Sequence, residues 1–349
     1  MIFASDNWAG AHPAVSDHLA ANSGGYATAY GNSEVDARVA KTFCDIFERE
    51  VGVYFVSTGT AANSLSMTAL ARPAGVAFAH AEAHMIADEG GAPEYLAGGL
   101  RLCPVDGALG RMDPTMLEEA IGRYPAAFLH SGQPAAVSIT QATEIGTVHS
   151  LDDIDTIAGI ARRHGLPLHM DGARFANALV ALDTTPAEMT WKRGVDIVSF
   201  GATKNGCWCA EAIVVMEPDK HEALPFLRKR AAQLFSKSRF VALQFEAYFR
   251  DDLWLSTARH SNAMAARLAE AFRASNAVRL AWEPQANEVF AIMSRERAEN
   301  FRRRGAIFHP WATPRGYEGV GADETICRFV TSFATTVEDV DGFTRLLAS

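Results

Sequence analysis

The sequence predicts an α/β protein whose mostly parallel sheet is flanked by helices, with a small C-terminal α+β domain. Two observations support this prediction. Short apolar runs alternate with helical patterns over residues 50–216, as in parallel strands joined by helical crossovers. After Pro218 this alternation stops, and residues 221–275 have helical periodicity. We therefore predict a large domain over 1–250 with a helical connector towards residue 275, and a small domain over 276–349.

The predicted strands are short and lie between turn formers or charged residues, as in buried strands of a parallel sheet. In the large domain they cover 53–56, 76–79, 126–129, 137–139, 166–170, 197–200 and 212–215. In the small domain they cover 289–293 and 326–330.

Capping residues indicate where helices begin. Asp113-Pro114 opens a helix over 113–122, because an aspartate cap followed by proline favours a first turn. A second helix is expected to start at Asp152 or Asp153 and to end near His164-Gly165. Apolar residues three and four apart predict further helices over 240–249, 260–273, 296–304 and 337–347.

Composition excludes several classes of protein. The 349 residues carry a formal net charge of −9, whereas a nucleic-acid-binding protein needs a basic face. No apolar run approaches the roughly 20 residues that span a membrane, and residues 1–7 do not resemble a signal peptide. Five irregularly spaced cysteines indicate reduced thiols and a cytoplasmic location. Cys207-Trp208-Cys209 lacks a second pair, so no metal site is predicted.

Two strand ends carry residues suited to covalent catalysis. Lys204 follows the strand 197–200 in a glycine-rich turn, where desolvation would make its amine a nucleophile towards a carbonyl. Asp171 directly follows the strand 166–170, 33 residues before Lys204, at the edge where open α/β sheets bind ligands. Pyridoxal phosphate requires such a pair: a lysine for the Schiff base and an acid for the pyridine nitrogen. The alternatives are a solvated loop lysine and a helix-capping aspartate.

Two other segments fit the same cofactor. Ser57 to Asn63 follow a strand with small residues, so free N–H groups at a helix start could hold a phosphate. An ordinary helix start has the same pattern. His84 lies beyond the strand 76–79, where an imidazole could stack on a planar ring or be structural.

Taken together, these segments resemble the low-specificity threonine aldolases, a group of fold-type I pyridoxal-phosphate enzymes related to the β-eliminating lyases. The resemblance extends over nearly the whole chain. It rests on the order and spacing of the segments at 5–7, 30–31, 58–63, 84–94, 132–134, 138–141, 171–174, 201–206 and 328–332.

The resemblance implies roles for the cofactor site. Lys204 would be the Schiff-base lysine, Asp171 the partner of the pyridine nitrogen and His84 the stacked imidazole. The phosphate cup would consist of Thr58, Gly59 and Thr60.

It also implies a substrate site and an assembly. Arg328, Arg174 and Ser5 would bind the substrate carboxylate, which an arginine fork fits in bidentate fashion, and Arg174 would also lie at the cofactor. Tyr30 and Lys229 would reach the site of a neighbouring subunit in a homotetramer, a dimer of dimers. Arg230 and Lys237 are alternatives to Lys229.

The chain departs from the family pattern at one point. Many members have a second histidine, in a Thr-His-Asn segment, whereas residues 141–146 contain none. The base that takes the substrate's hydroxyl proton is therefore expected to be His84 or a water it holds, with Glu144 and His130 as alternatives at the substrate.

The implied reaction is cleavage of an L-β-hydroxy-α-amino acid, such as threonine or allo-threonine, to glycine and an aldehyde. β-Elimination and transamination on the same scaffold are alternatives, since all three would share Lys204 and Asp171. A non-catalytic amino-acid-binding protein is a third possibility, because fold alone does not establish function.

Overall fold

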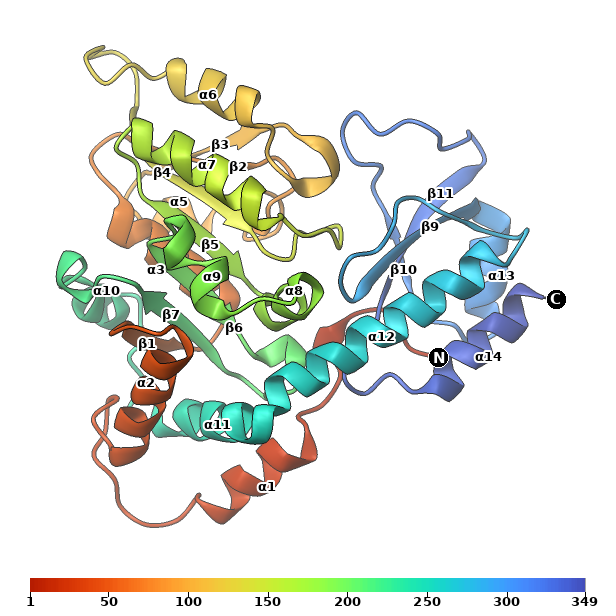
Figure 1. Cartoon of the computed structure of the whole chain (residues 1–349), viewed down its shortest axis with the longest axis horizontal. Helices are drawn as coiled ribbons and strands as arrows, with labels where there is room; N and C mark the ends of the chain where they lie inside the picture. The colour runs from red at the N-terminus through yellow and green to blue at the C-terminus, as the bar shows by residue number, and fades with distance from the viewer. Residues whose placement is uncertain (349) are drawn as a thin grey trace.

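The computed structural model describes residues 1–348 and has a seven-stranded sheet at the centre of its larger part (Figure 1). The strand order is β1-β7-β6-β5-β4-β2-β3, and only β7 runs antiparallel to its neighbours. The strands are β1 (Gly52–Val56), β2 (Gly75–His80), β3 (Arg101–Val105), β4 (Gln133–Thr140), β5 (Leu168–Gly172), β6 (Ile197–Gly201) and β7 (Glu211–Val215). The mostly parallel α/β fold is thus confirmed.

Helices cover both faces of this sheet, and each face has its own apolar core. The helices up to β7 are α1 (Pro13–Ala21), α2 (Glu34–Ile46), α3 (Gly59–Leu70), α4 (His84–Ala87), α5 (Ala92–Leu96), α6 (Pro114–Gly122), α7 (Leu151–Arg163), α8 (Phe175–Leu182) and α9 (Pro186–Met189). Those after β7 are α10 (Leu224–Arg230), α11 (Arg239–Phe249), α12 (Leu253–Arg273), α13 (Arg295–Arg303) and α14 (Val337–Leu347).

Phe200 on β6 lies at the centre of an aromatic cluster. Its side chain is fully buried, and six other aromatic rings have their centroids 5.0–6.4 Å from its own. These rings come from α2, α8, α11 and α12 and from residues directly after α2, so they hold the helical layer against the strand that leads to Lys204.

We expect Phe200→Ala to lower the free energy of unfolding by about 3–5 kcal/mol, because it removes a buried ring and leaves a cavity. Urea titration followed by circular dichroism would measure the loss. Phe226→Ala is the control, since Phe226 is 78% exposed and its loss should change stability by less than about 0.5 kcal/mol. Equal effects of the two substitutions would contradict this account of the core.

A second, antiparallel sheet follows in the order β10-β11-β9-β8. Its strands are β8 (Arg279–Leu280), β9 (Glu288–Ser294), β10 (His309–Trp311) and β11 (Glu324–Val330). One face packs on α12, α13 and α14, and the other faces the large sheet through Phe290, Ile292 and Ile326, which contact Ile145. The long helix α12 runs from α11 to this second sheet (Figure 1).

The N-terminal residues pack with this second sheet. The Phe3 N–H donates to the Ile307 carbonyl at 2.7 Å, and the Val330 N–H donates to the Phe3 carbonyl at 2.9 Å. Phe3 is fully buried in the apolar cluster of the second sheet, although the sequence analysis assigns it to the large domain. The boundaries 1–250 and 276–349 remain predictions.

Some predicted elements differ from the structure. The strand predicted at 126–129 is wrong, because these residues form turns in which Phe128 and Leu129 are exposed. The sequence analysis missed β3, an edge strand that contains Pro104, where a missing N–H is tolerated. Helix α7 is capped by Ser150 and not by an aspartate.

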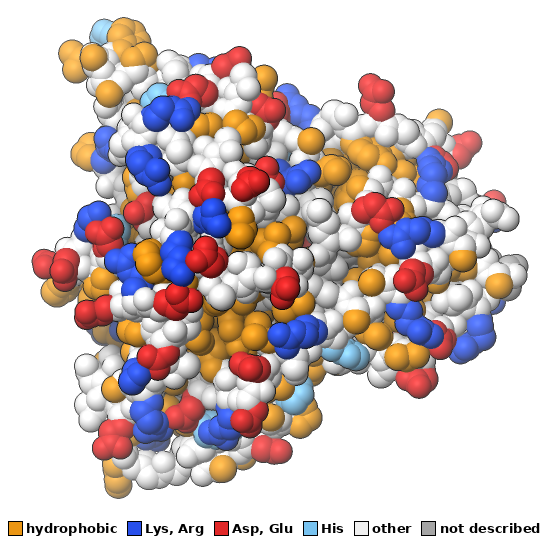
Figure 2. Space-filling model, in the orientation of Figure 1, with side chains coloured by type: hydrophobic (Ala, Val, Ile, Leu, Met, Phe, Trp, Pro, Cys, Tyr) orange, Lys and Arg blue, Asp and Glu red, His pale blue; other side chains and the backbone are white. Residues whose placement is uncertain are grey.

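The surface carries charges of both signs. Figure 2 shows acidic and basic side chains interspersed over the face in view, with apolar side chains between them. Within residues 1–348, none of the helices combines the length and apolar character needed to cross a membrane. All five cysteines are free thiols.

Candidate active site

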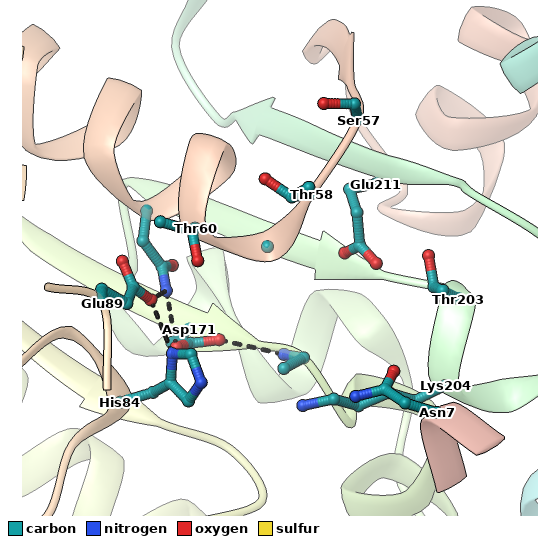
Figure 3. A pocket seen from close by; sticks show the side chains of 13 residues that line it. Asn7, Ser57, Thr58, Thr60, His84, Glu89, Asp171, Thr203, Lys204 and Glu211 are labelled. Atoms are coloured by element: carbon teal, nitrogen blue, oxygen red, sulfur yellow. Dashed lines mark hydrogen bonds and ion pairs between the residues drawn. The ribbon is translucent and has the colours of Figure 1, made fainter. Parts of the chain in front are cut away.

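A cavity of about 250 Å³ opens where the carboxyl ends of the central strands meet the N-terminus of α3. Figure 3 shows its polar side chains converging from several elements. The lining residues are Asn7, Ser57, Thr58, Gly59, Thr60, Asn63, His84, Glu89, Asp171, Ala173, Thr203, Lys204 and Glu211. Six predicted site residues therefore share one cavity, as expected at the carboxyl edge of an open α/β sheet.

Lys204 lies on a short 3₁₀ turn (Thr203–Asn205) directly after β6, and its side chain extends into the cavity (Figure 3). The next residue anchors this turn: the Asn205 amide donates 2.8 Å hydrogen bonds to the Tyr248 hydroxyl and the Trp254 carbonyl. Gly206 then has a φ of +114°, which favours glycine. The fixed turn limits where the lysine amine can reach.

Asp171 is buried at the end of β5. Its carboxylate accepts hydrogen bonds from the Asn63 amide at 2.8 Å and from the Ala173 N–H at 3.0 Å. Burial, with the nearby Glu89 carboxylate, raises the pKa of Asp171 above its usual range. A cationic N–H group beside Asp171 would stabilise the ionised carboxylate and so lower its pKa again, because a nearby opposite charge favours the charged form.

His84 begins α4 and is oriented by an acid. Its Nδ1 lies 2.9 Å from the Glu89 carboxylate, and the same Glu89 oxygen accepts from the Asn63 amide at 2.8 Å. The Glu89 hydrogen bond raises the pKa of His84, against the effect of burial. The Asn63 amide therefore donates both to Asp171 and to the acid that orients His84.

The start of α3 forms one wall of the cavity. Thr58 caps the helix by accepting from the Ala61 N–H at 3.0 Å. Before it, the Ser57 N–H and hydroxyl both donate to the Gln233 side chain, at 3.0 and 2.9 Å. Gly59 and Thr60 are the first helical residues, and such N–H groups have no intrahelical partner. A phosphate fits this position.

The two predicted arginines converge next to this cavity, although neither lines it. Arg174 is buried and forms a bidentate pair with Asp6, with N···O distances of 2.7 and 3.0 Å. Arg328 donates to the Ala4 carbonyl at 3.4 Å and stacks over Trp311 at 4.5 Å. Ser5 lies between the residues that the two arginines hold, and its hydroxyl accepts from the Asn7 N–H at 3.1 Å.

The two alternative bases lie in different places. Glu144 is buried in the loop after β4 and interacts electrostatically with His84 and Arg174. His130 is exposed in the loop before β4, with its ring against Phe128. That loop lies at the amino edge of the parallel strands, opposite the cavity, so the structure does not bring His130 to the site of its own chain.

Tyr30 and Lys229 are adjacent to each other but do not line the cavity. The Lys229 amine lies 5.7 Å from the centre of the Tyr30 ring, and both side chains are exposed. Two residues far apart in sequence, both expected to serve a neighbouring subunit, thus form one exposed patch.

The sequence analysis did not assign several residues that the structure places in the site. Asn63, Glu89 and Glu211 line the cavity, and burial raises the pKa of Glu211 to about 7. Asp6 and Glu288 surround the arginines. Asn63 and Glu89 lie within segments that carried the resemblance, whereas Glu211 and Glu288 begin strands and have no local signal.

These features define a class: a lyase of the fold-type I architecture with a lysine and a buried aspartate at neighbouring strand ends. Residues 3–296 match the model of the beta-eliminating lyase family, a family of pyridoxal-phosphate-dependent enzymes, and the chain belongs to it. Within this family the chain is 37% identical over 344 residues to a low specificity L-threonine aldolase of Pseudomonas aeruginosa, covering 98% of this chain and 96% of the relative. It therefore belongs to the low-specificity L-threonine aldolases.

Two further comparisons agree with this assignment. A low specificity L-threonine aldolase of a Pseudomonas species is 36% identical over 337 residues, covering 96% of this chain and 95% of the relative. A solved structure of a Leishmania major threonine aldolase superposes with a TM-score of 0.91 at 28% identity, covering 99% of this chain and 98% of that one. The predicted family and fold type are confirmed.

Proposed function

We propose that the protein is a low-specificity L-threonine aldolase that cleaves threonine, allo-threonine or a related L-β-hydroxy-α-amino acid to glycine and an aldehyde. The observation that carries this proposal is that Lys204, Asp171 and His84 line one cavity, next to the N-terminus of α3. Family membership supports the same reaction.

The described residues fit pyridoxal phosphate as the cofactor. None of the residues 1–348 provides the buried Asp171 with a cationic hydrogen-bond partner, and the start of α3 offers N–H donors of the kind that bind phosphate. Lys204 would hold the cofactor's aldehyde carbon. Once bound, the cofactor would supply the electron sink for the bond that breaks.

The protein's own residues would bind and orient the substrate. Arg328 and Arg174 would hold the carboxylate with Ser5, which fixes the rotation about the substrate's Cα. Asp171 would keep a proton on the pyridine nitrogen, and His84 would lie against the ring.

We propose His84 as the base for the hydroxyl proton. Its Nδ1 is engaged by Glu89, so Nε2 is the nitrogen left to take a proton, directly or through a water. Glu144 remains an alternative, since it lies near both His84 and Arg174.

The His84 proposal predicts a pH effect for Glu89→Gln. Glu89 stabilises the protonated imidazole and raises the pKa of His84, while the base must be unprotonated to act. Removing the carboxylate should therefore move the acid limb of the kcat/KM profile to lower pH, by up to about one unit. Steady-state rates between pH 5.5 and 9 would measure it. His84→Gln should abolish this limb, and an unmoved limb in Glu89→Gln would argue for another base.

Product analysis tests the reaction itself. Incubation of the holoenzyme with L-threonine should yield glycine and acetaldehyde in equal amounts. Ammonia with a keto acid would indicate β-elimination, and an amino group transferred to an added keto acid would indicate transamination. A protein that binds threonine without any of these products would support the non-catalytic alternative.

We also propose a homo-oligomer in the cytoplasm. The exposed Tyr30–Lys229 patch could complete a neighbouring subunit's site, with Arg230 and Lys237 as alternative contributors. An apolar groove that includes Leu19, Trp208 and Phe240 offers further surface for such contacts. Light scattering would test the tetramer. Five free thiols suit a reducing compartment.

A further inference from the structure

Glu288, the first residue of β9, is an acid without a hydrogen-bond partner. The residue is 0% exposed, and neither carboxylate oxygen accepts a hydrogen bond from residues 1–348. Its Oε1 lies 3.3 Å from Arg174 Nη2 and 3.8 Å from Arg328 Nη1. The two arginines proposed for the substrate carboxylate thus already converge on a carboxylate of the protein.

Acids outnumber the guanidinium groups in this cluster. Three acids face the guanidinium groups from three elements: Asp6 from the N-terminal 3₁₀ turn, Glu144 from the loop after β4 and Glu288 from β9. Glu288 itself faces two cations, Arg174 at the start of α8 and Arg328 on β11, while the Lys204 amine also acts on Asp6. A substrate carboxylate entering here would be a fourth negative charge, at a place where burial makes unpaired charge costly.

Glu288 is better able than Asp6 to lose its charge. Asp6 is fixed by the Arg174 fork and the Asn287 amide, and its pKa is lowered. Glu288, in contrast, accepts no hydrogen bond from residues 1–348, and burial raises its pKa to about 7, against the effect of the two arginines. A protonated Glu288 would leave both arginines to the ligand and could donate its own O–H.

We propose that Glu288 takes up a proton from solvent when a substrate carboxylate binds to Arg174 and Arg328, and returns it when the ligand leaves. Glu288 is then a positioning residue that links amino-acid binding to pH. This inference rests on the proposed function, which places the substrate carboxylate at these arginines.

Glycine binding to the holoenzyme tests the link. We would follow the visible absorption of the bound cofactor during glycine titration at pH 6 and pH 9, in wild type and Glu288→Gln. At pH 6 the two dissociation constants should agree within about twofold. At pH 9 the variant should bind about tenfold tighter, because each unit by which the ligand raises the pKa of Glu288 corresponds to tenfold. Titration of the amine and cofactor is common to both proteins and cancels in the ratio.

Glu324→Gln is the matched control. Glu324 lies at the other end of the β9–β11 pair, where it pairs with Arg279 and faces neither arginine of the site. Its loss should leave the pH dependence of glycine binding as in wild type. If Glu288→Gln weakened glycine binding to the same extent at both pH values, Glu288 would only hold the arginines in place, and the proposal would be overturned. It would also be overturned if the ratio of the wild-type and variant dissociation constants were the same at pH 6 and pH 9.

A second measurement needs no variant. Acetate has a carboxylate but no amine, so it cannot react with the cofactor. Calorimetry of acetate binding to the wild-type holoenzyme in buffers of different ionisation enthalpy should show proton uptake that is largest at about pH 7.5 and smaller towards pH 6 and pH 9. Binding without uptake, or no binding at millimolar acetate, would overturn the proposal. Absorption that does not respond to glycine at any pH would instead count against the proposed function.

Discussion

Replacing Lys204 by alanine should abolish cleavage of threonine while the chain remains folded. The lysine amine would form the covalent link to the cofactor and move protons at the substrate's Cα, and no other described lysine lines the cavity. We expect kcat to fall by a factor on the order of 10⁴ or more, which corresponds to about 5 kcal/mol in the activation barrier.

The fold should tolerate this change, because Lys204 forms no hydrogen bond or ion pair with the described residues, and Asn205 rather than Lys204 anchors the turn. Thermal unfolding of the apoprotein should therefore match wild type within about 2 °C. Lys220→Ala is the control, since Lys220 is exposed and, within residues 1–348, forms its ion pair with Glu217 alone. Turnover retained by Lys204→Ala would end the Schiff-base assignment; loss of both turnover and melting transition would require the same assay on Lys204→Arg.

The predicted residues that line the cavity share one property: each lies at or shortly after the carboxyl end of a strand. Lys204 follows β6, Asp171 ends β5 and Thr58 follows β1. Strands of a parallel sheet bring their carboxyl ends to one edge, so strand positions alone place such residues together. His84 follows β2 and was found by the same argument.

The parts that were missed depend on contacts between distant segments. Glu89 and Asn63 meet across 26 residues, and Arg174 and Asp6 meet across 168. Glu288 reaches the site only because the second sheet packs its Phe290 face against the loop after β4. No local pattern encodes these pairings, since each residue type is ordinary in its own segment.

The errors have the same origin. The run 126–129 is apolar enough for a strand, yet β2 takes β3 and β4 as its neighbours, which leaves 126–129 in the connection before β4. His130 lies in that connection and so falls at the wrong edge of the sheet. Whether a short apolar run becomes a strand thus depends on the partners available to it.

Asp171→Asn should remove most of the turnover and retain the cofactor. The amide keeps the shape of the carboxylate but not its charge, so it can no longer hold a proton on the pyridine nitrogen. We expect kcat to fall by a factor on the order of 10³, about 4 kcal/mol, while the visible absorption of the bound cofactor persists. A merely capping Asp171 would leave kcat unchanged, because an asparagine caps equally well.

The stability of the apoprotein provides a second test, because Asp171→Asn should raise stability while it lowers kcat. Burial and Glu89 raise the pKa of Asp171 in the folded apoprotein, so folding favours its protonated form. That contribution is fully present below the unfolded pKa, near 3.8, and is lost as pH rises through the folded value. At pH 7 the ionised Asp171 therefore destabilises the apoprotein, and Asp171→Asn should raise its melting temperature, with the gain vanishing towards pH 4.

Asp196→Asn separates the two effects. Asp196 is partly buried and, like Asp171, has a raised pKa, but it precedes β6 at the amino edge and accepts from the Leu168 N–H, away from the cavity. This substitution should shift apoprotein stability in the same direction and leave kcat at the wild-type value. A stabilised but inactive Asp171→Asn beside an active Asp196→Asn would mean that the Asp171 charge is kept at a cost to folding, because the cofactor's ring requires it.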